Sequence, residues 1–412
     1  MTDAFAPARE MLRADEAVTA LLAAIHPVAE TESVKLFEAP GRVLAADLAA
    51  RRTQPPFDNS AMDGYALRAA DLDGAETRLK VTGRIAAGDP PGQILKPGEA
   101  FRIFTGAPIP VGGDGVVMQE DCRFEDGFVT LRPTKRGANV RPAGEDFMRG
   151  DIVLTAGKRL LPQDVGHAAA AGHAALTVRR RPRVALFATG DEVREPGQDD
   201  TPGTIVNSNT YVLHGLLRRL GCEPVWEGIA PDRPDALRAL LSGAASRGVD
   251  AILTTGGVSM GEEDHVKGAV EALGALHFWR IAIRPGRPLA FGHVAGTPFV
   301  GLPGNPVAAM VTFLIFARPM LLRLAGAPFS PPQSYPVAAD FAFRKKPGRR
   351  EWLRGHLRPG PDGGLVARRF PNEGSGIFTS VVASTGLIEL ADERGDIRPG
   401  DTVPFLPFSE ML

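Results

Sequence analysis

Three glycine-rich and polar segments have the residue types that bind phosphate groups. They are residues 189–192 (TGDE), 254–264 (TTGGVSMGEED) and 301–306 (GLPGNP). Glycine lets backbone amides approach a phosphate closely, and a helix that begins after such a loop adds a favourable partial positive charge. None of the three has the spacing of a Walker-type NTPase loop or of a dinucleotide-binding fingerprint. Each alone could be an ordinary turn, but three at one edge of a sheet favour a ligand site.

Acidic residues accompany these loops. Asp191 and Glu192 lie in the first loop, Asp232 follows an expected strand, and residues 262–264 (EED) end the second loop. Carboxylates repel a phosphate unless a hard cation lies between them, and Mg²⁺ is commonly held by one or two carboxylates and a ligand phosphate. The pattern therefore predicts a Mg²⁺-dependent phosphate site. Any single acid here could also cap a helix or lie in a solvated turn.

Arginines cluster in the segment WRIAIRPGRP, at Arg280, Arg284 and Arg287. Beside glycine-rich loops, such a cluster suits phosphate or another tetrahedral oxyanion. A salt-bridged strand end explains it equally well from the sequence alone.

A second polar region spans residues 55–72, where Asp58 and Asp63 are five residues apart, and residues 105–108 (TGAP) and 144–146 (GED) are similar. Turn chemistry explains most of these residues. Nothing in the sequence resembles a Ser-His-Asp or Cys-His nucleophile. From the residues alone we infer an enzyme for a nucleotide or phosphate ligand, with Mg²⁺ and an Arg-rich anion pocket.

The elements that must position the three loops alternate between residues 183 and 326. Apolar strand segments and helical periods follow one another, which predicts a parallel, doubly wound sheet covered on both faces. Ligands of such sheets bind beyond the carboxyl ends of the strands. The expected strands are 184–189, 223–229, 250–255, 276–283, 288–292 and 298–301, and the expected helices are 210–220, 234–246, 265–273 and 306 to about 324.

The rest of the chain divides into regions that differ in composition and in the spacing of apolar residues. We therefore expect a multidomain protein of the α/β plus β fold class. Residues 1–50 and 149–179 are expected to form one segmented domain, interrupted by a β-rich domain at 51–148. The α/β domain is expected at 180–327, and short strands with Pro and Gly turns at 328–412 predict a C-terminal β-barrel.

Composition limits the function further. The 412 residues carry a net charge of −1, which excludes the overall basic balance of a non-specific nucleic-acid binder. The two cysteines, Cys122 and Cys222, are far apart, so neither a disulfide framework nor a thiolate zinc site is expected. The most apolar run, residues 308–317, is shorter than the about 20 residues of a membrane span, and the N-terminus does not look like a signal peptide. We therefore expect a cytoplasmic protein that binds neither nucleic acid nor membranes.

A series of motifs carries a family resemblance. SAMDGYALRAADL, RIFTGAPIP, VVMQED, GEDF, ATGDE, NSNT, TTGGVSMGEEDHVK, AIRPGRPLAFG and GLPGNPVA occur in this order, followed by GSGIFTS. Together they resemble the molybdopterin molybdenumtransferase (MoeA) family, and the chain is similar to the E domain of gephyrin. The resemblance implies an elongated subunit with a molybdopterin-binding α/β domain. It also implies a homodimer whose active cleft combines the α/β domain of one subunit with the β-rich domain of the other.

The resemblance assigns roles to individual residues. The implied catalytic residues are Asp63, Thr105, Asp146, Glu192, Asp232 and Asp264, of which Asp232 and Asp264 are the Mg²⁺ candidates. The implied substrate-binding residues are Gly256, Gly257, Ser259, Arg280, Arg284, Pro303, Asn305, Arg354 and Ser375. Arg280 and Arg284 stand where family members often have Lys, and the general excess of 39 Arg over 8 Lys explains this. Preference for molybdate over tungstate stays open.

The implied reaction inserts molybdenum from molybdate into adenylylated molybdopterin, with Mg²⁺ and with release of AMP. Molybdopterin adenylyltransferase and molybdoenzyme-maturation proteins are the further partners expected. One alternative is that the chain is itself a molybdopterin adenylyltransferase, although such enzymes carry TGGTG and this chain has TTGGVSMG. Another is a catalytically weak carrier of molybdopterin or molybdenum cofactor. The presence of all five acids among the implied catalytic residues favours the transferase.

Overall fold

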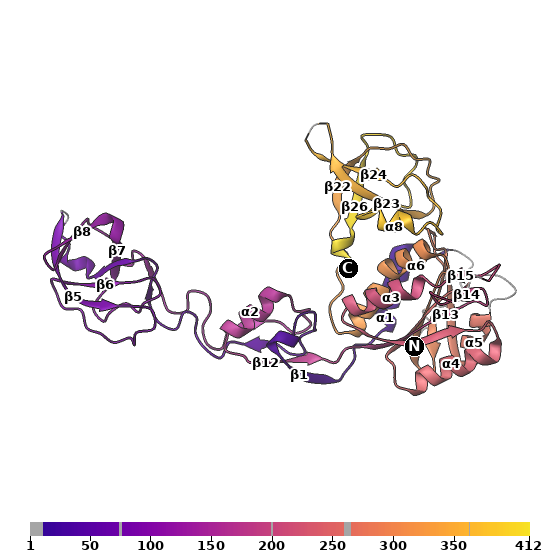
Figure 1. Cartoon of the computed structure of the whole chain (residues 1–412), viewed down its shortest axis with the longest axis horizontal. Helices are drawn as coiled ribbons and strands as arrows, with labels where there is room; N and C mark the ends of the chain where they lie inside the picture. Colours follow the sequence, from indigo (N-terminus) through magenta and orange to yellow (C-terminus); the bar gives the residue numbers. More distant parts are fainter. Residues whose placement is uncertain (1–10, 74–75, 199–200, 259–264, 362) are drawn as a thin grey trace.

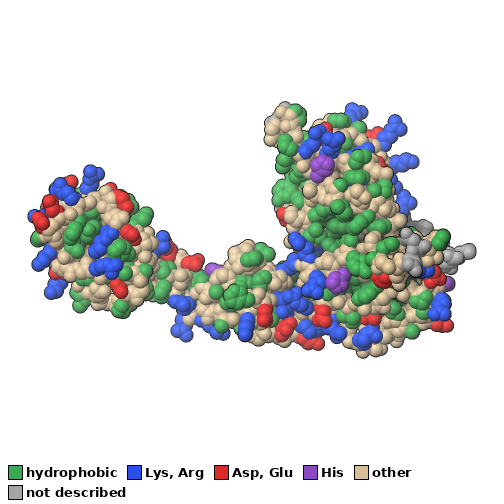
Figure 2. All heavy atoms as spheres, viewed as in Figure 1, with side chains coloured by type: hydrophobic (Ala, Val, Ile, Leu, Met, Phe, Trp, Pro, Cys, Tyr) green, Lys and Arg blue, Asp and Glu red, His purple; other side chains and the backbone are tan. Residues whose placement is uncertain are grey.

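The structure is a computed structural model that describes residues 11–73, 76–198, 201–258, 265–361 and 363–412. The subunit is elongated (Figure 1). A β-rich domain lies at one end, a small domain built from two chain segments lies in the middle, and the α/β domain lies at the other end beside a C-terminal barrel. On the face shown in Figure 2, the β-rich domain is well separated from the α/β domain.

The α/β domain is built on a six-stranded sheet in the order β16-β13-β17-β21-β20-β18. The strands are β13 (Arg183–Thr189), β16 (Glu223–Ala230), β17 (Ala251–Thr255), β18 (Gly274–Arg280), β20 (Pro288–Val294) and β21 (Thr297–Leu302). The expected parallel pairing holds for β16, β13, β17 and β21, but β20 and β18 are antiparallel to their neighbours. The turn between β20 and β21 consists of Ala295 and Gly296, both with positive φ. Such a two-residue turn produces an antiparallel hairpin, which is why the parallel prediction fails here.

Helices cover both faces of this sheet, because side chains of β13 alternate between two cores. Val184 and Leu186 belong to one core and Ala185 and Phe187 to the other. The first core includes α3 (Asn209–Arg219), α6 (Pro306–Thr312) and α7 (Arg318–Leu324), and the second includes α4 (Pro234–Ser246) and α5 (His265–Leu273).

The N-terminal helix α1 (Ala14–Ala24) also packs into the first core. Its buried Ala17 and Leu21 share that core with Met320 and Leu321 of α7. The sequence pattern predicts this helix in the segmented domain, whereas in the structure its apolar side packs into the core of the α/β domain. The reason is that its apolar stripe needs an apolar partner, and the helix at 306–324 supplies one.

Residues 306–324 form a continuous helix of 19 residues, with a π-helical turn at Phe313–Ala317 between α6 and α7. Pro319 has no N–H for the carbonyl of Ile315, and the N–H of Arg318 instead bonds the carbonyl of Phe313. Among the described residues, only this helix is long and apolar enough to cross a membrane, which the shorter run seen in the sequence did not suggest. Inside the protein, 83% of its apolar window is buried, as in a core helix.

The middle domain joins two distant segments. Strand β1 (Thr31–Lys35) pairs antiparallel with β12 (Ala175–Arg179), and β2 (Leu48–Ala49) pairs with β11 (Ile152–Leu154). Helix α2 (Pro162–Ala170) contributes Ala168 to the small core between them. Because both pairings bracket the β-rich residues, that domain is an insertion into the middle domain.

The inserted domain contains an open sheet in the order β7-β4-β6-β5-β9-β8. Its strands are β4 (Gly64–Leu67), β5 (Thr77–Ile85), β6 (Glu99–Ile103), β7 (Gly115–Met118), β8 (Cys122–Glu125) and β9 (Phe128–Leu131), with β3 (Asn59–Ser60) and β10 (Val140–Arg141) paired beside it.

The C-terminal domain is a closed barrel of five strands, because β23 pairs with both β24 and β25. The strands are β22 (Tyr335–Ala339), β23 (Arg350–Pro359), β24 (Leu365–Arg369), β25 (Gly386–Leu390) and β26 (Thr402–Pro407). A short strand of the α/β domain, β19 (Ile283–Arg284), pairs with β23 and ties the barrel to that domain.

Candidate functional site

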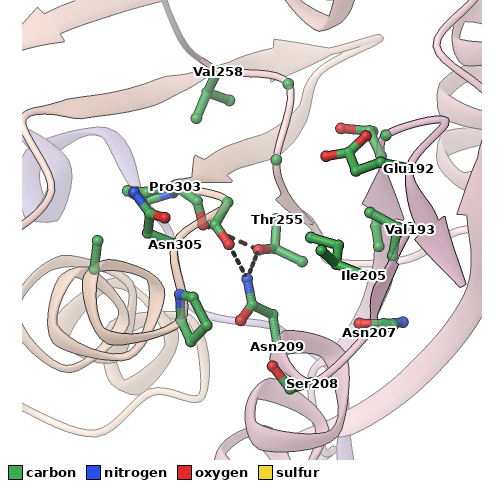
Figure 3. A pocket seen from close by; sticks show the side chains of 18 of the residues that line it. Glu192, Val193, Ile205, Asn207, Ser208, Asn209, Thr255, Val258, Pro303 and Asn305 are labelled. Carbon is green, nitrogen blue, oxygen red and sulfur yellow. Dashed lines mark hydrogen bonds between the residues drawn. The ribbon is translucent and has the colours of Figure 1, made fainter. Parts of the chain in front are cut away.

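A cavity of about 600 Å³ opens where β13, β17 and β21 end. The three glycine-rich loops line it, and Val193 and Ile205, from the short strand pair β14 (Val193–Arg194) and β15 (Ile205–Val206), form another wall (Figure 3). Among the residues assigned from the sequence, those that line the cavity are Glu192, Asp232, Gly256, Gly257, Pro303, Asn305 and Ser375.

Asn209 holds two of the loops together. Its Nδ2 donates to Thr255 Oγ1 (2.8 Å) and to the carbonyl of Gly304 (2.7 Å), and Thr255 Oγ1 donates to the carbonyl of Pro303 (3.1 Å) (Figure 3). Asn209 is not among the site residues predicted from the sequence. A clue was present in the NSNT motif, because an asparagine directly before the expected helix start can bond a neighbouring loop instead of capping the helix.

Three polar atoms on cavity-lining residues are buried without a hydrogen-bond partner in the described parts of the chain. They are Thr189 Oγ1, Asn207 Nδ2 and Asn209 Oδ1. The orientation of Asn207 is fixed, because its Oδ1 accepts hydrogen bonds from the N–H (3.3 Å) and the hydroxyl (2.8 Å) of Thr210. Buried polar atoms in proteins normally have partners. Each atom belongs to a cavity-lining residue, so the cavity wall has hydrogen-bonding capacity that the described chain does not use.

The glycines of the second loop are required by packing. Gly256 and Gly257 have φ of +91° and +64°. A Cβ on Gly256 would lie 2.7 Å from the carbonyl oxygen of Thr189, and one on Gly257 would lie 2.5 Å from Val266 Cγ2. These residues therefore bring the loops close together, and their glycine identity alone does not demonstrate a phosphate contact.

Two acids face the cavity. Glu192 and Asp232 line it, and Asp191 Oδ1 accepts a hydrogen bond from the backbone N–H of Asp232 (3.0 Å), which links the loops after β13 and β16. The predicted residues Asp264 and Ser259 lie outside the described residues. Within the described ranges, no group of three His, Cys, Asp or Glu side chains could hold a metal.

The cationic side of the cavity lies toward the barrel. Arg287 lines the cavity, which its place in the Arg cluster already suggested, whereas Arg284 does not. Arg284 instead forms ion pairs with Glu373 (3.0 Å) and Glu351 (3.6 Å). The backbone of Arg280 belongs to β18, but its side chain lies outside the description.

Arg354 organises the loop that carries Ser375. Its guanidinium is buried and donates to Ser380 Oγ (3.0 Å) and to the carbonyls of Asn372 (3.1 Å) and Gly374 (3.4 Å). Burial lowers the pKa of Arg354. The N–H of Val307 donates to the carbonyl of Ser375 (3.0 Å), which fixes the same loop against α6. Arg354 is not among the residues that line the cavity, and these contacts give it a positioning role.

The remaining predicted residues lie in the β-rich domain. Asp63 Oδ1 accepts hydrogen bonds from the N–H and the hydroxyl of Thr105, both at 2.8 Å. The backbone bond first, and then the hydroxyl, lower the pKa of Asp63. Asp146 lines a separate cleft of about 460 Å³. Because this domain lies at the far end of the subunit (Figure 1), one chain does not bring these residues to the α/β cavity.

Family models match three consecutive parts of the chain. Residues 12–172 match the MoeA N-terminal region (domain I and II), residues 185–323 match a probable molybdopterin binding domain, and residues 336–408 match the MoeA C-terminal region (domain IV).

Individual relatives agree with these matches. A molybdopterin molybdenumtransferase of Haemophilus influenzae is 37% identical over 405 residues, which cover 98% of this chain and 100% of that relative. One from Nostoc is 41% identical over 306 residues, covering 72% of this chain and 70% of the relative. The crystal structure of the molybdopterin biosynthesis moeA protein from Pyrococcus horikoshii matches with a TM-score of 0.83 and 31% identity, covering 97% of this chain and 100% of the other.

Proposed function

The chain belongs to the MoeA family, and on that basis we propose that it is a molybdopterin molybdenumtransferase. It inserts molybdenum from molybdate into adenylylated molybdopterin and releases AMP. The observation that carries the proposal is the 600 Å³ cavity at the ends of β13, β17 and β21, with its glycine-rich loops and its buried polar atoms without partners. A ligand with many donors and acceptors, such as a pterin with a phosphate, suits this lining.

Mg²⁺ fits the donor set of the cavity. Glu192 and Asp232 supply carboxylate oxygens, which are the ligands that Mg²⁺ prefers. We assign Asp232, together with Asp264, to hold the ion, which would neutralise charge on the phosphoanhydride. Within the chain, Asp191 keeps the Asp232 loop beside the β13 loop through the hydrogen bond to the Asp232 N–H.

The chain's own groups bind and orient the two substrates. Asn207, Asn209 and Thr189 offer buried polar atoms to the pterin part, and the amide bridge of Asn209 keeps the loops at 255 and 304 in place. Arg287 and Ser375, at the barrel side, face the position expected for an oxyanion. Arg guanidinium and Ser hydroxyl groups both donate hydrogen bonds, and a tetrahedral oxyanion such as molybdate accepts them.

The active form is a homodimer with a composite site. Asp63, Thr105 and Asp146 belong to the β-rich domain, which lies far from the α/β domain of its own chain (Figure 1), and in this proposal a second copy delivers them. Large exposed apolar side chains in and beside the middle domain support an interface there, because soluble proteins usually bury such groups: Phe37, Met148, Ile152 and Leu161. The protein acts in the cytoplasm, where molybdopterin adenylyltransferase and molybdoenzyme-maturation proteins are the further partners proposed.

The decisive experiment follows AMP release from adenylylated molybdopterin by the purified protein with Mg²⁺. Release triggered by molybdate, with a product that activates a molybdenum-free apoenzyme, supports the proposal. Tight binding without AMP release would identify a carrier. ATP-dependent adenylylation of molybdopterin as the main activity would identify an adenylyltransferase. Either of these results contradicts the transferase.

A further inference from the structure

One carboxylate, that of Glu373, lies between two arginines in a loop that also carries a cavity-lining residue. Glu373 Oε2 is 3.0 Å from Arg284 Nη2, and its Oε1 is 3.6 Å from Arg369 Nη1. Glu373 is two residues from Ser375, which lines the cavity, and Arg284 is three residues from Arg287, which also lines it. Neither Arg284 nor Glu373 lines the cavity itself, but each is two or three residues along the chain from Ser375 or Arg287, to which the proposed function assigns the oxyanion.

The second carboxylate partner of Arg284 is fixed in place. Glu351 is 1% exposed and accepts a hydrogen bond from Arg349 Nε at 2.7 Å through Oε1, while its Oε2 lies 3.6 Å from Arg284 Nη1. A carboxylate buried this deeply is costly to move, because it would lose its partner in a region of low dielectric. Glu373, whose side chain is 32% exposed, is the partner that Arg284 can exchange.

The backbone around Glu373 is held on both sides. Arg354 Nη2 donates to the carbonyls of Asn372 and Gly374, and the N–H of Gly374 donates to Asn372 Oδ1 at 2.9 Å. Arg369, on the other side of Glu373, also donates to the carbonyl of Pro371 at 3.1 Å. With the loop held in this way, the Glu373 side chain can leave Arg284 by rotating, without displacement of the loop that carries Ser375.

We propose that Glu373 is an internal competitor for Arg284, and that a tetrahedral dianion must displace its carboxylate to bind the anion pocket. The ion pair thus keeps Arg284 neutralised in the free protein and sets the concentration of molybdate at which the pocket fills. The inference rests on the proposed function for the identity of the anion. A dianion near Glu373 is repelled about twice as strongly as a monoanion at the same position, since Coulomb energy scales with charge. Glu373 is therefore a residue that determines anion affinity and selectivity.

The test measures molybdate binding to the full chain by calorimetry at fixed ionic strength. Glu373→Gln removes the competing charge and is expected to bind molybdate roughly tenfold more tightly than the unmodified protein, which corresponds to about 1.4 kcal/mol. Glu393→Gln is the matched control. It removes one acidic charge from another Glu–Arg pair of the barrel, with Arg13 at 2.7 Å, and is expected to leave molybdate affinity unchanged.

A second probe separates charge from shape. Perrhenate is a tetrahedral oxyanion with a single charge, and its gain in affinity on Glu373→Gln is expected to be smaller than the gain of molybdate. Equal gains for both anions would overturn the assignment of Glu373 as a residue that selects anions by charge, because the cost of breaking the Arg284 pair is the same for both. Unchanged or weaker molybdate binding by Glu373→Gln, or no binding by any variant, would overturn the inference altogether, since Glu373 would then merely position Arg284. These measurements require no turnover, so a failure of AMP release would contradict the proposed function and leave the binding comparison intact.

Discussion

The α/β cavity and the predicted site residues of the β-rich domain, Asp63, Thr105 and Asp146, carry similar side chains but are constructed differently. In the cavity, Asn209 links two loops, Gly256 and Gly257 pack against Thr189 and Val266, and polar atoms are buried. In the β-rich domain, the carboxylate of Asp63 lies at the surface and accepts two hydrogen bonds from Thr105. The first region has the shape of a binding site by itself. The second region presents ionised carboxylates at the protein surface, and in the proposed homodimer these approach the cavity of the other subunit.

This difference indicates a division of labour. Under the proposed function, the cavity binds and orients substrate before the second region arrives, because its geometry is fixed within one domain. In the proposed homodimer, the β-rich region contributes charge only when a partner subunit brings it close. Each region can therefore be damaged separately, and the expected consequences differ in size.

The largest effect tests whether the two regions meet across subunits. Asp63→Asn and Asp232→Asn are each expected to lower AMP release by about 100-fold or more. When the two variants are mixed and allowed to exchange subunits, half of the dimers become mixed. Each mixed dimer has one intact site, so roughly a quarter of the original activity returns. No recovery, with mixed dimers verified by mass spectrometry, would mean that both residues act within one chain or that the regions never meet.

A pair of glycine substitutions compares how tightly the loops are packed in the α/β cavity and in the β-rich domain. Gly257→Ala combines positive φ with a contact of 2.5 Å to Val266, and we expect it to destabilise the α/β domain by about 3–5 kcal/mol. Gly106→Ala has positive φ, but its new Cβ would meet only Ala87, at 3.7 Å, so we expect about 1–2 kcal/mol. Urea unfolding of both variants measures this, and equal losses would show that the cavity loops are not tightly packed.

The amide bridge of the cavity is tested by Asn209→Ala. The change leaves the carbonyl of Gly304 without its side-chain donor and separates the loops that follow β17 and β21, which is expected to cost about 1–3 kcal/mol. Ser208→Ala is the control, because the side chain of Ser208 makes no capping hydrogen bond to α3. Urea unfolding should separate the two variants. If both lose the same stability, the bridge does not hold the loops.

The smallest effect concerns pH. Thr105→Val removes the hydroxyl bond to Asp63 but keeps the backbone bond, so the pKa of Asp63 rises part of the way toward its ordinary value. Because a lowered pKa keeps the carboxylate charged as the pH falls, activity that needs this charge is lost on the acid side. In the pH profile of AMP release, the fall in rate on the acid side should therefore occur at higher pH in the variant. Asp58, whose Oδ1 accepts from the N–H of Ala143 instead, offers a control as Asp58→Asn, with the fall in rate on the acid side expected to stay in place.

The sequence was sufficient to predict the helices whose apolar residues recur with a strong helical period. The helices expected at 234–246 and 265–273 have those bounds in the structure, because their apolar positions recur with the helical period. Strand direction was less predictable. An apolar run does not indicate which strand it pairs with or in which direction. Only the Ala295-Gly296 turn reveals that β20 and β21 form a hairpin. The packing of α1 likewise depends on a helix almost 300 residues further along the chain.

Within the site, loop positions were predictable and side-chain partners were not. Strand ends and glycines indicated the edge where the cavity lies. Asn209 was missed because its hydrogen bonds go to residues 46 and 95 positions away, which no local pattern reports. Arg354 was expected to contact substrate, but its bonds to the loop at 372–380 depend on how the barrel closes. Residue type indicates which bonds a side chain can make, and only the fold decides where they go.

The insertion of the β-rich domain has a consequence for the order in which the newly made chain can fold. Strand β1 finds its partner β12 about 140 residues later, so the middle domain stays open while the ribosome makes everything between them. At synthesis rates of about 5–20 residues per second, that wait lasts about 7–28 seconds. The inserted domain has its own cores and can complete itself during this interval. Its closure would then keep residues 50 and 150 near each other, which shortens the loop that the middle domain must still close.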